Sequence, residues 1–284
     1  MAKKPRTHQL RHVVAVSNYK GGIGKTATVM NLAAAIAQRL ENYRVLVIDI
    51  DSSCSLSKLL GWKLEDEEKG APTLFTSMYF KGRGLPVYPT GRKNLYLCPS
   101  SVNISGIKAV LDCREDPNSA LKEVMDRPLD IHVPENDDLH DTPSPTLSEC
   151  FDFVFIDSQP SKSSMNNNAL YASDGCIIPT ELEEESINEM TKIAVAAGKI
   201  AKQTGRLSVH GVLITKYDGR LRTSKYYEPK IRQMFRDTFK TVIRYSKDIG
   251  ESRTLHEDVF ETYGGGRAAQ DYVALASEYL RKFA

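Results

Sequence analysis

The sequence lacks the features that mark secreted, membrane-spanning and metal-binding proteins. No run approaches the roughly 18 consecutive apolar residues of a membrane-spanning helix, and the N-terminus has no apolar core of the kind found in secretory signals. The 284 residues include only five cysteines, which form neither a C-x-x-C pair nor a zinc-ligand spacing. We therefore expect a cytoplasmic protein with reduced thiols and without a zinc or iron–sulfur centre.

Composition predicts a folded chain with two unusual segments. With 41 % hydrophobic and 26 % charged residues, the chain can bury a sizeable core, and we expect one domain over residues 1–284. Residues 1–11 form a basic tail without acids. Residues 115–149 combine five prolines with few apolar residues, which predicts an acidic, exposed and partly disordered insertion with a short helix at 119–126.

Charge is segregated along the chain, although the formal net charge is only +2. Residues 112–150 contain eleven acidic and three basic side chains, whereas residues 216–253 contain eleven basic and five acidic ones. The second segment therefore has the charge of a surface that faces a polyanion.

Apolar runs alternate with helical patterns along the chain. Strands are predicted at 12–17, 45–50, 95–98, 153–156, 176–179, 209–215 and 241–243. The clearest helices are predicted at 25–40, 186–203 and 267–283. Strands that alternate with helices imply right-handed crossovers. The expected fold class is α/β, a doubly wound, mostly parallel sheet with helices on both faces.

A glycine-rich turn joins the first expected strand to the first expected helix. Glycines let successive backbone N–H groups converge on phosphates at a helix N-terminus. Lys25 would reach the β- and γ-phosphates, and Thr26 would give its hydroxyl to Mg²⁺. This context makes the fold P-loop NTPase-like, while the residues alone leave ATP and GTP open. The residues predicted to bind the nucleotide are Gly21, Gly22, Ile23, Gly24, Lys25, Thr26 and Ala27.

Charged residues outside this turn extend the predicted site. Lys20 stands at the start of the loop, where an ordinary P-loop needs no lysine. It is either a surface lysine that attracts anions or a group that reaches the phosphates of a partner subunit, much as an arginine finger does. Asp49 lies within the predicted strand 45–50, Asp51 directly follows it, and Asp157 directly follows the strand at 153–156. These acids are candidates for holding Mg²⁺ or orienting the attacking water.

Together these motifs resemble those of the ParA/MinD family of deviant Walker A ATPases. The chain looks most similar to the ParA/Soj branch, the plasmid and chromosome partition ATPases, from about His12 through the C-terminal helix. The stretches that resemble this branch are Lys20–Thr26, Asn31–Ala33, Val45–Asp51, Phe153–Asp157, Gly211–Arg220 and Ala268–Glu278.

The resemblance implies an ATP-dependent switch between monomer and homodimer. In a sandwich dimer of this kind, Lys20 contacts phosphates across the interface, Asp51 orients water for hydrolysis, and Asp49 helps to hold Mg²⁺. The dimer would bind double-stranded DNA without sequence preference, and a ParB-like centromere-binding adaptor would stimulate slow ATP hydrolysis. The residues implied to hold adenine are Pro179, Thr215, Lys216 and Asp218.

Three departures from the family pattern bear on hydrolysis. Ala27 stands where a second threonine is common. Ser52–Ser53 replaces a Pro-Gln pair, and Gln159–Pro160 replaces the usual Pro-Pro after Asp157. They affect the expected rate of hydrolysis more than nucleotide binding. A nucleotide-gated structural module that never hydrolyses ATP is therefore an alternative.

A basic helix is predicted after Pro229, which suits a first helical turn. Its apolar face would contain Ile231, Phe235 and Phe239. Because neither a recognition helix nor an aromatic platform is evident, we expect no base-specific readout. The residues expected to contact DNA phosphates are Arg232, Arg236 and Lys240 at a spacing of four, with Arg244 and Lys247 beyond them.

The main alternative is a membrane-positioning ATPase of the MinD type, which would have a basic amphipathic C-terminal helix. Here Tyr272, Leu275, Tyr279 and Phe283 fall at helical spacing and are expected to pack on the sheet, so we expect no membrane binding. An electron carrier similar to the nitrogenase iron protein is disfavoured, because the cluster cysteines of that family are absent.

Overall fold

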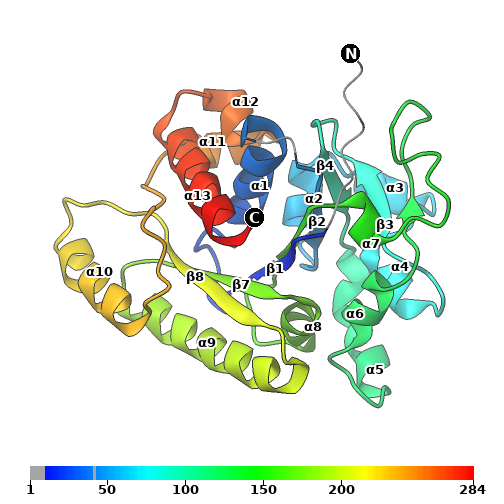
Figure 1. Cartoon of the computed structure of the whole chain (residues 1–284), viewed down its shortest axis with the longest axis horizontal. Coiled ribbons are helices and arrows are strands. Elements are labelled where there is room, and N and C mark those ends of the chain that lie inside the picture. The colour runs from blue at the N-terminus through cyan, green and yellow to red at the C-terminus, as the bar shows by residue number, and fades with distance from the viewer. Residues whose placement is uncertain (1–9, 41–42) are drawn as a thin grey trace.

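A mostly parallel sheet runs through the middle of the molecule (Figure 1). The computed structural model describes residues 10–40 and 43–284. Its eight strands lie in the order β5-β3-β4-β2-β6-β1-β7-β8, and only the β3–β4 pair is antiparallel. This confirms the predicted fold class. The strands are β1 (His12–Val16), β2 (Val45–Asp49), β3 (Pro86–Pro89), β4 (Leu95–Cys98), β5 (Asp130–Ile131), β6 (Phe153–Asp157), β7 (Gly175–Thr180) and β8 (Ser208–Ile214).

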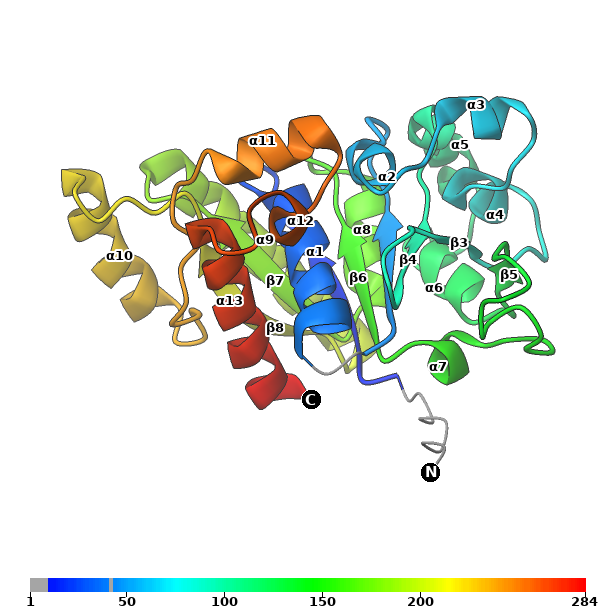
Figure 2. The ribbon, with the colours of Figure 1, turned by 90° about the horizontal axis from the view of Figure 1, so that it is seen from above.

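Helices cover both faces of the sheet, as predicted. Figure 1 shows α1, α12 and α13 on one face and α8 and α9 on the other, while Figure 2 places α10 at one end of the molecule and α3 to α6 at the other. The first half of the chain forms α1 (Lys25–Ala34) with a π-helical continuation (Ala35–Leu40), α2 (Ser55–Leu59), α3 (Leu64–Glu68), α4 (Leu74–Tyr79), a 3₁₀ turn (Val102–Gly106), α5 (Ile107–Asp112) and α6 (Ala120–Met125). The second half forms α7 (Leu147–Cys150), α8 (Ser164–Ala172), α9 (Glu184–Thr204), α10 (Arg222–Met234), α11 (Asp248–Leu255), α12 (Val259–Tyr263) and α13 (Arg267–Phe283).

Alternate residues of each central strand enter two separate cores. In β1, Val14 and Val16 face the core shared with α1 and α13, whereas Val13 and Ala15 face the core shared with α8 and α9. This follows from the two-residue side-chain period of a strand. A strand buried on both faces reads as a continuous apolar run, which is why the central strands are visible in the sequence.

Two elements of the basic segment differ from the prediction. Residues 241–243 are not a strand, although the backbone N–H of Ile243 donates to Ile214 O of β8 at 2.9 Å. The predicted helix after Pro229 is α10, which begins earlier, contains Pro229 and ends at Met234. Phe235 has an extended backbone, so the helical spacing read across residues 232–240 does not exist.

The acidic insertion 115–149 is more integrated than expected. The predicted short helix is present as α6, and Leu121 and Val124 of this helix are buried in the core. Leu139 and Leu147, farther along the segment, are buried as well. The expectation of an exposed, partly disordered segment is therefore wrong for its apolar positions. Most of the basic tail 1–11 lies outside the described residues.

The C-terminal helix α13 packs its apolar face inside the molecule, as predicted. Tyr272, Leu275 and Tyr279 are buried, and Phe283 packs against the same core. The Tyr279 hydroxyl lies 3.0 Å from His210 Nδ1 of β8. Across the described part of the chain, no helix is long and apolar enough to cross a membrane.

We expect His210 to make the protein less stable as the pH falls. Burial lowers the pKa of His210 to about 3, whereas a histidine in the unfolded chain has a pKa near 6.5. The unfolded chain therefore binds more protons between these values, and the free energy of unfolding declines as the pH falls from 6.5 towards 3. In urea unfolding, the wild type should lose about 2 kcal/mol more than His210→Gln between about pH 7 and about pH 5. Equal losses would contradict this role.

Candidate functional site

The glycine-rich turn lies between the end of β1 and the start of α1. Gly22 and Gly24 have φ values of +75° and +89°, in the left-handed region that favours glycine. Gly24 is the N-cap of α1, and the helix begins at Lys25. The first N–H groups of a helix have no partner within it. The turn therefore presents backbone donors at the positive end of a helix dipole, which suits phosphate.

Lys25 is buried within this turn, with a relative exposure of 6 %. Its Nζ donates to Lys20 O at 2.7 Å. Burial lowers the pKa of Lys25, while the nearby charges of Asp157 and Asp51 act in the opposite direction. The Lys25 amine is thus held within the glycine-rich turn, and its contact with phosphate stays a prediction.

Thr26 and Asp157 meet at the ends of two neighbouring elements. The Thr26 hydroxyl lies close enough to the Asp157 carboxylate to lower its pKa. Its Oδ1 atom is buried and has no hydrogen-bond partner among the described residues. Burial and the neighbouring Asp49 raise the pKa of Asp157 well above its usual range. An unsatisfied carboxylate oxygen beside a hydroxyl fits Mg²⁺, which would offset the cost of burying this charge.

Magnesium at this position would need ligands from outside the protein. Over residues 10–40 and 43–284, no three His, Cys, Asp or Glu side chains are grouped to hold a metal ion. Mg²⁺ in nucleotide sites is commonly held by one or two protein groups together with phosphates and water. The arrangement therefore matches a cation that arrives with a nucleotide.

Both carboxylate oxygens of Asp49 accept hydrogen bonds within the protein. Its Oδ2 accepts from the Ser57 backbone at 2.9 Å and from the Ser57 hydroxyl at 2.7 Å, and its Oδ1 accepts from Asp51 N at 3.0 Å. Burial raises its pKa to about 6, although these hydrogen bonds lower it. Asp51 is only half-buried and accepts from Ser53 N. Asp49 therefore fixes the backbone that positions Asp51.

Lys20 is held by two acids of its own chain. Its Nζ is bonded to Glu183 and lies 2.8 Å from Glu185 Oε2, both at the start of α9. These partners raise the pKa of Lys20. Both acids are well exposed, and exposed ion pairs contribute only about 0–1 kcal/mol each. The pairs are therefore weak enough for Lys20 to exchange them for phosphate.

The residues expected to hold adenine lie near the C-terminal ends of β7 and β8. Thr215 is buried, and its hydroxyl donates to Ile23 O at 2.9 Å, so this hydrogen bond fixes Thr215 to the glycine-rich turn. Pro179 lies within β7. Lys216 is ion-paired with Glu181 at 2.8 Å. Asp218 forms an ion pair with Arg220. Contact between these residues and adenine stays a prediction.

Asn18 and Gln159 support the site through hydrogen bonds that the sequence analysis did not predict. Asn18 donates to Pro179 O at 2.8 Å and accepts from Lys20 N at 3.1 Å, so it ties the loop to β7. Gln159 donates to Ile50 O at 2.9 Å, and its own N–H donates to Asn166 at 3.0 Å. Each lies within three residues of a predicted strand end, which is the signal that could have found it.

The predicted basic face of one helix is not formed, because α10 ends before Arg236 and Lys240. Arg232 donates to Glu228 Oε1 at 3.0 Å and to Phe239 O at 2.8 Å, so it fastens α10 to the segment that follows. Arg236 and Lys240 are exposed. The grouping of these three residues on one helix face is therefore wrong.

The other two predicted DNA contacts also differ from each other. Arg244 donates to Asp271 Oδ1 of α13 through Nε at 3.0 Å and Nη2 at 2.7 Å. Lys247 is exposed and is the N-cap of α11. Contact with DNA stays a prediction for all five basic residues.

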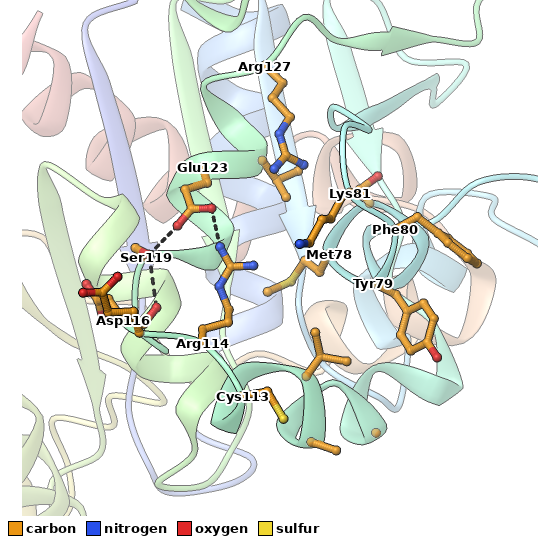
Figure 3. A pocket seen from close by; sticks show the side chains of 16 residues that line it. Met78, Tyr79, Phe80, Lys81, Cys113, Arg114, Asp116, Ser119, Glu123 and Arg127 are labelled. Carbon is orange, nitrogen blue, oxygen red and sulfur yellow. Dashed lines mark hydrogen bonds and ion pairs between the residues drawn. The ribbon is translucent and has the colours of Figure 1, made fainter.

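A large cavity of about 980 Å³ lies between α4, α5 and α6, away from the phosphate loop (Figure 3). Arg114 is bonded to Glu123 beside it, and Ser119 donates to the same carboxylate at 2.6 Å. The residues that line this cavity include none of the predicted nucleotide, metal or DNA contacts. The cavity is therefore separate from the nucleotide site.

Comparison with known proteins places this site in a family. The model for the CobQ/CobB/MinD/ParA nucleotide-binding domain matches residues 14–259. The chromosome-partitioning ATPase Soj of Thermus thermophilus is 27 % identical, and the match covers 95 % of each chain. A Cyanothece McdA–ATP complex has a TM-score of 0.78 at 21 % identity, covering 97 % of this chain and 98 % of the other. The septum site-determining protein MinD of Pyrococcus horikoshii, complexed with Mg-ADP, has a TM-score of 0.70 at 21 % identity and covers 94 % of each chain. The chain belongs to the CobQ/CobB/MinD/ParA family of nucleotide-binding domains.

Proposed function

We propose that this chain is a DNA-partition ATPase that acts in plasmid or chromosome segregation. The observation that carries the proposal is the loop itself, in which Lys20 stands beside a buried Lys25 and the Thr26–Asp157 pair. The matched relative named a chromosome-partitioning ATPase supports the same assignment. Cytoplasmic location at the nucleoid follows from DNA binding.

Each residue of the loop has a separate task in this proposal. Lys25 and the loop N–H groups bind the phosphates of ATP, and Thr26 and Asp157 hold Mg²⁺. Mg²⁺ supplies charge neutralisation at the phosphates. Asp51 orients the attacking water, and Asp49 positions Asp51 through its backbone. Ala27 contributes its backbone N–H only, which accords with slow hydrolysis.

Dimerisation and DNA binding follow from the charges around the site. When ATP is bound, Lys20 leaves its acidic partners and contacts the phosphates of a second subunit. The homodimer then places the exposed basic segment after α10 against double-stranded DNA, without sequence preference. A ParB-like adaptor stimulates hydrolysis and returns the protein to the monomer.

A DNA mobility assay with ATP, ADP and no nucleotide, repeated across salt concentrations, tests this function. Retention of duplex DNA should require ATP and should weaken steeply as salt rises. Retention that is the same with ATP, with ADP and without nucleotide would refute the switch. Absence of retention under all three conditions would refute DNA binding.

Removal of the acids that hold Lys20 is expected to strengthen dimerisation. In Glu183→Gln/Glu185→Gln, Lys20 has no ion pairs to give up, so the ATP-dependent dimer should form about threefold to tenfold more tightly. Sedimentation velocity with ATP and with ADP measures this change. Glu184→Gln/Glu68→Gln alters charge equally and should match the wild type. An unchanged or weaker dimer would show that Lys20 does not act across the interface.

A membrane-positioning ATPase of the MinD type is the second candidate, because two structural neighbours bear that name. The packing of α13 argues against it, since the apolar face such a helix would insert into lipid is buried. Sedimentation with liposomes and ATP separates the two candidates. Robust liposome binding would favour the membrane function.

A further inference from the structure

A groove separate from the cavity between α4, α5 and α6 lies on the α8–α9 face of the sheet, next to the nucleotide site. It has a volume of about 470 Å³ and is lined by the second half of α9, the start of α8 and Tyr19. Its apolar surface includes Tyr19, Val195 and Ile200. Val195 is 54 % exposed, which is high for an aliphatic side chain in a helix that packs on a sheet. The groove therefore offers apolar surface to a binding partner.

The charged residues that line this groove are all cationic. The lining contains Lys162, Lys192 and Lys199 and includes neither aspartate nor glutamate. Lys192 is paired with Glu189 outside the lining, at 2.5 Å. The amino groups of Lys162 and Lys199 are exposed and make no ion pair or hydrogen bond with any described residue. Two unpaired cations thus flank an apolar floor, and the groove lacks the negative charge that would balance them.

The combination of an apolar floor and unpaired lysines distinguishes between anionic occupants of the groove. Duplex DNA presents a smooth row of phosphates and would leave the floor formed by Tyr19, Val195 and Ile200 uncovered. A free phosphate ion would leave the same surface exposed. An acidic peptide segment with one apolar side chain satisfies both parts, because its carboxylates pair with the lysines while its apolar group covers the floor.

We propose that this groove is a docking site for an acidic segment of a protein partner, anchored by one apolar side chain and paired with Lys162 and Lys199. Occupancy of the groove does not depend on the proposed function. Any effect of the bound segment on ATP turnover rests on the proposed function, whereas the binding test below does not.

The position of the groove gives such a partner access to the nucleotide site. Tyr19 directly precedes Lys20. Lys162 precedes Ser163, whose hydroxyl lies 3.1 Å from Gln159 Oε1, and Gln159 in turn holds Ile50 O. A segment bound in the groove would therefore contact both chain segments that lead to the phosphate loop and to Asp51.

The test uses the full-length protein and a fluorescein-labelled nonapeptide with eight glutamates around one central leucine. Fluorescence anisotropy should show binding to the wild type and at least tenfold weaker binding to Lys162→Glu/Lys199→Glu. The control Lys108→Glu/Lys202→Glu changes charge equally at exposed lysines outside the groove and should bind like the wild type. A peptide with serine in place of leucine should bind at least threefold more weakly.

Several outcomes would overturn the proposal. Equal loss of binding in both double variants would mean that the peptide responds to overall charge alone, and absence of binding to the wild type would mean that the groove does not accept an acidic segment. Loss of duplex DNA retention by Lys162→Glu/Lys199→Glu, with peptide binding intact, would assign these lysines to the DNA surface instead. Circular dichroism of each variant confirms that the comparison is made between folded proteins.

Discussion

Substitution of Lys25 by methionine is expected to reduce the affinity of the protein for MgATP by at least about 100-fold. The buried amine lies among the loop donors, where it would form charge-assisted hydrogen bonds with two phosphates. Each such bond contributes about 1.5–3 kcal/mol. Two of them amount to about 3 kcal/mol or more, and every 1.4 kcal/mol, roughly, is a factor of ten in affinity. Titration with a fluorescent ATP analogue measures the change.

The same variant separates binding from folding. Because burial lowers the pKa of Lys25, the charged amine is costly to the nucleotide-free protein, and methionine removes that cost while it keeps the apolar stem. The thermal midpoint without nucleotide should therefore not fall, whereas the rise on adding MgATP should disappear. The exposed Lys63→Met is the matched control. Affinity of Lys25→Met within threefold of the wild type would contradict the assignment.

The central part of this site could be predicted because its signals are local. β1, the glycine turn and α1 are contiguous in the sequence, and the apolar runs that form β2 and β6 end in the acids that approach the loop. The parallel register pairs Asp49 with Asp157. Such strand ends meet at one edge of a parallel sheet whatever the connections between them.

The features that could not be predicted depend on contacts between residues that are distant in the sequence. Lys20 is held by acids about 160 positions away, and no local pattern indicates that they face it. The sequence predicts a helix start at Pro229 because the first turn is the commonest helical position of proline, yet α10 contains Pro229 in its interior. β5, which is an edge strand, and its neighbour β3 are short, so periodicity gives little signal for them. The burial of the acidic insertion depends on neighbours that only the fold supplies.

Substitution of Arg236 and Lys240 by glutamate is expected to reduce ATP-dependent retention of duplex DNA at least tenfold. Both side chains are exposed in the segment after α10, and reversing them removes phosphate contacts and adds repulsion. Each lost phosphate contact makes the negative slope of log K against log salt shallower by about 0.9, so the magnitude of the slope should fall by about 2. Fluorescence anisotropy with a labelled duplex measures affinity and slope together. Lys108→Glu/Lys202→Glu supplies the same charge change elsewhere and should retain DNA.

The pair Arg232→Gln/Arg244→Gln should behave differently, although the sequence places both arginines in the same basic segment. Arg232 holds the carbonyl of Phe239, and Arg244 holds Asp271, whose side chain is only 10 % exposed. Loss of these guanidinium groups leaves the Asp271 carboxylate without its cationic partner, so the thermal midpoint should fall. MgATP affinity should persist below that midpoint. If this pair loses DNA retention with an unchanged thermal midpoint, while Arg236→Glu/Lys240→Glu retains DNA, then the DNA surface is formed by the paired arginines and not by the exposed ones.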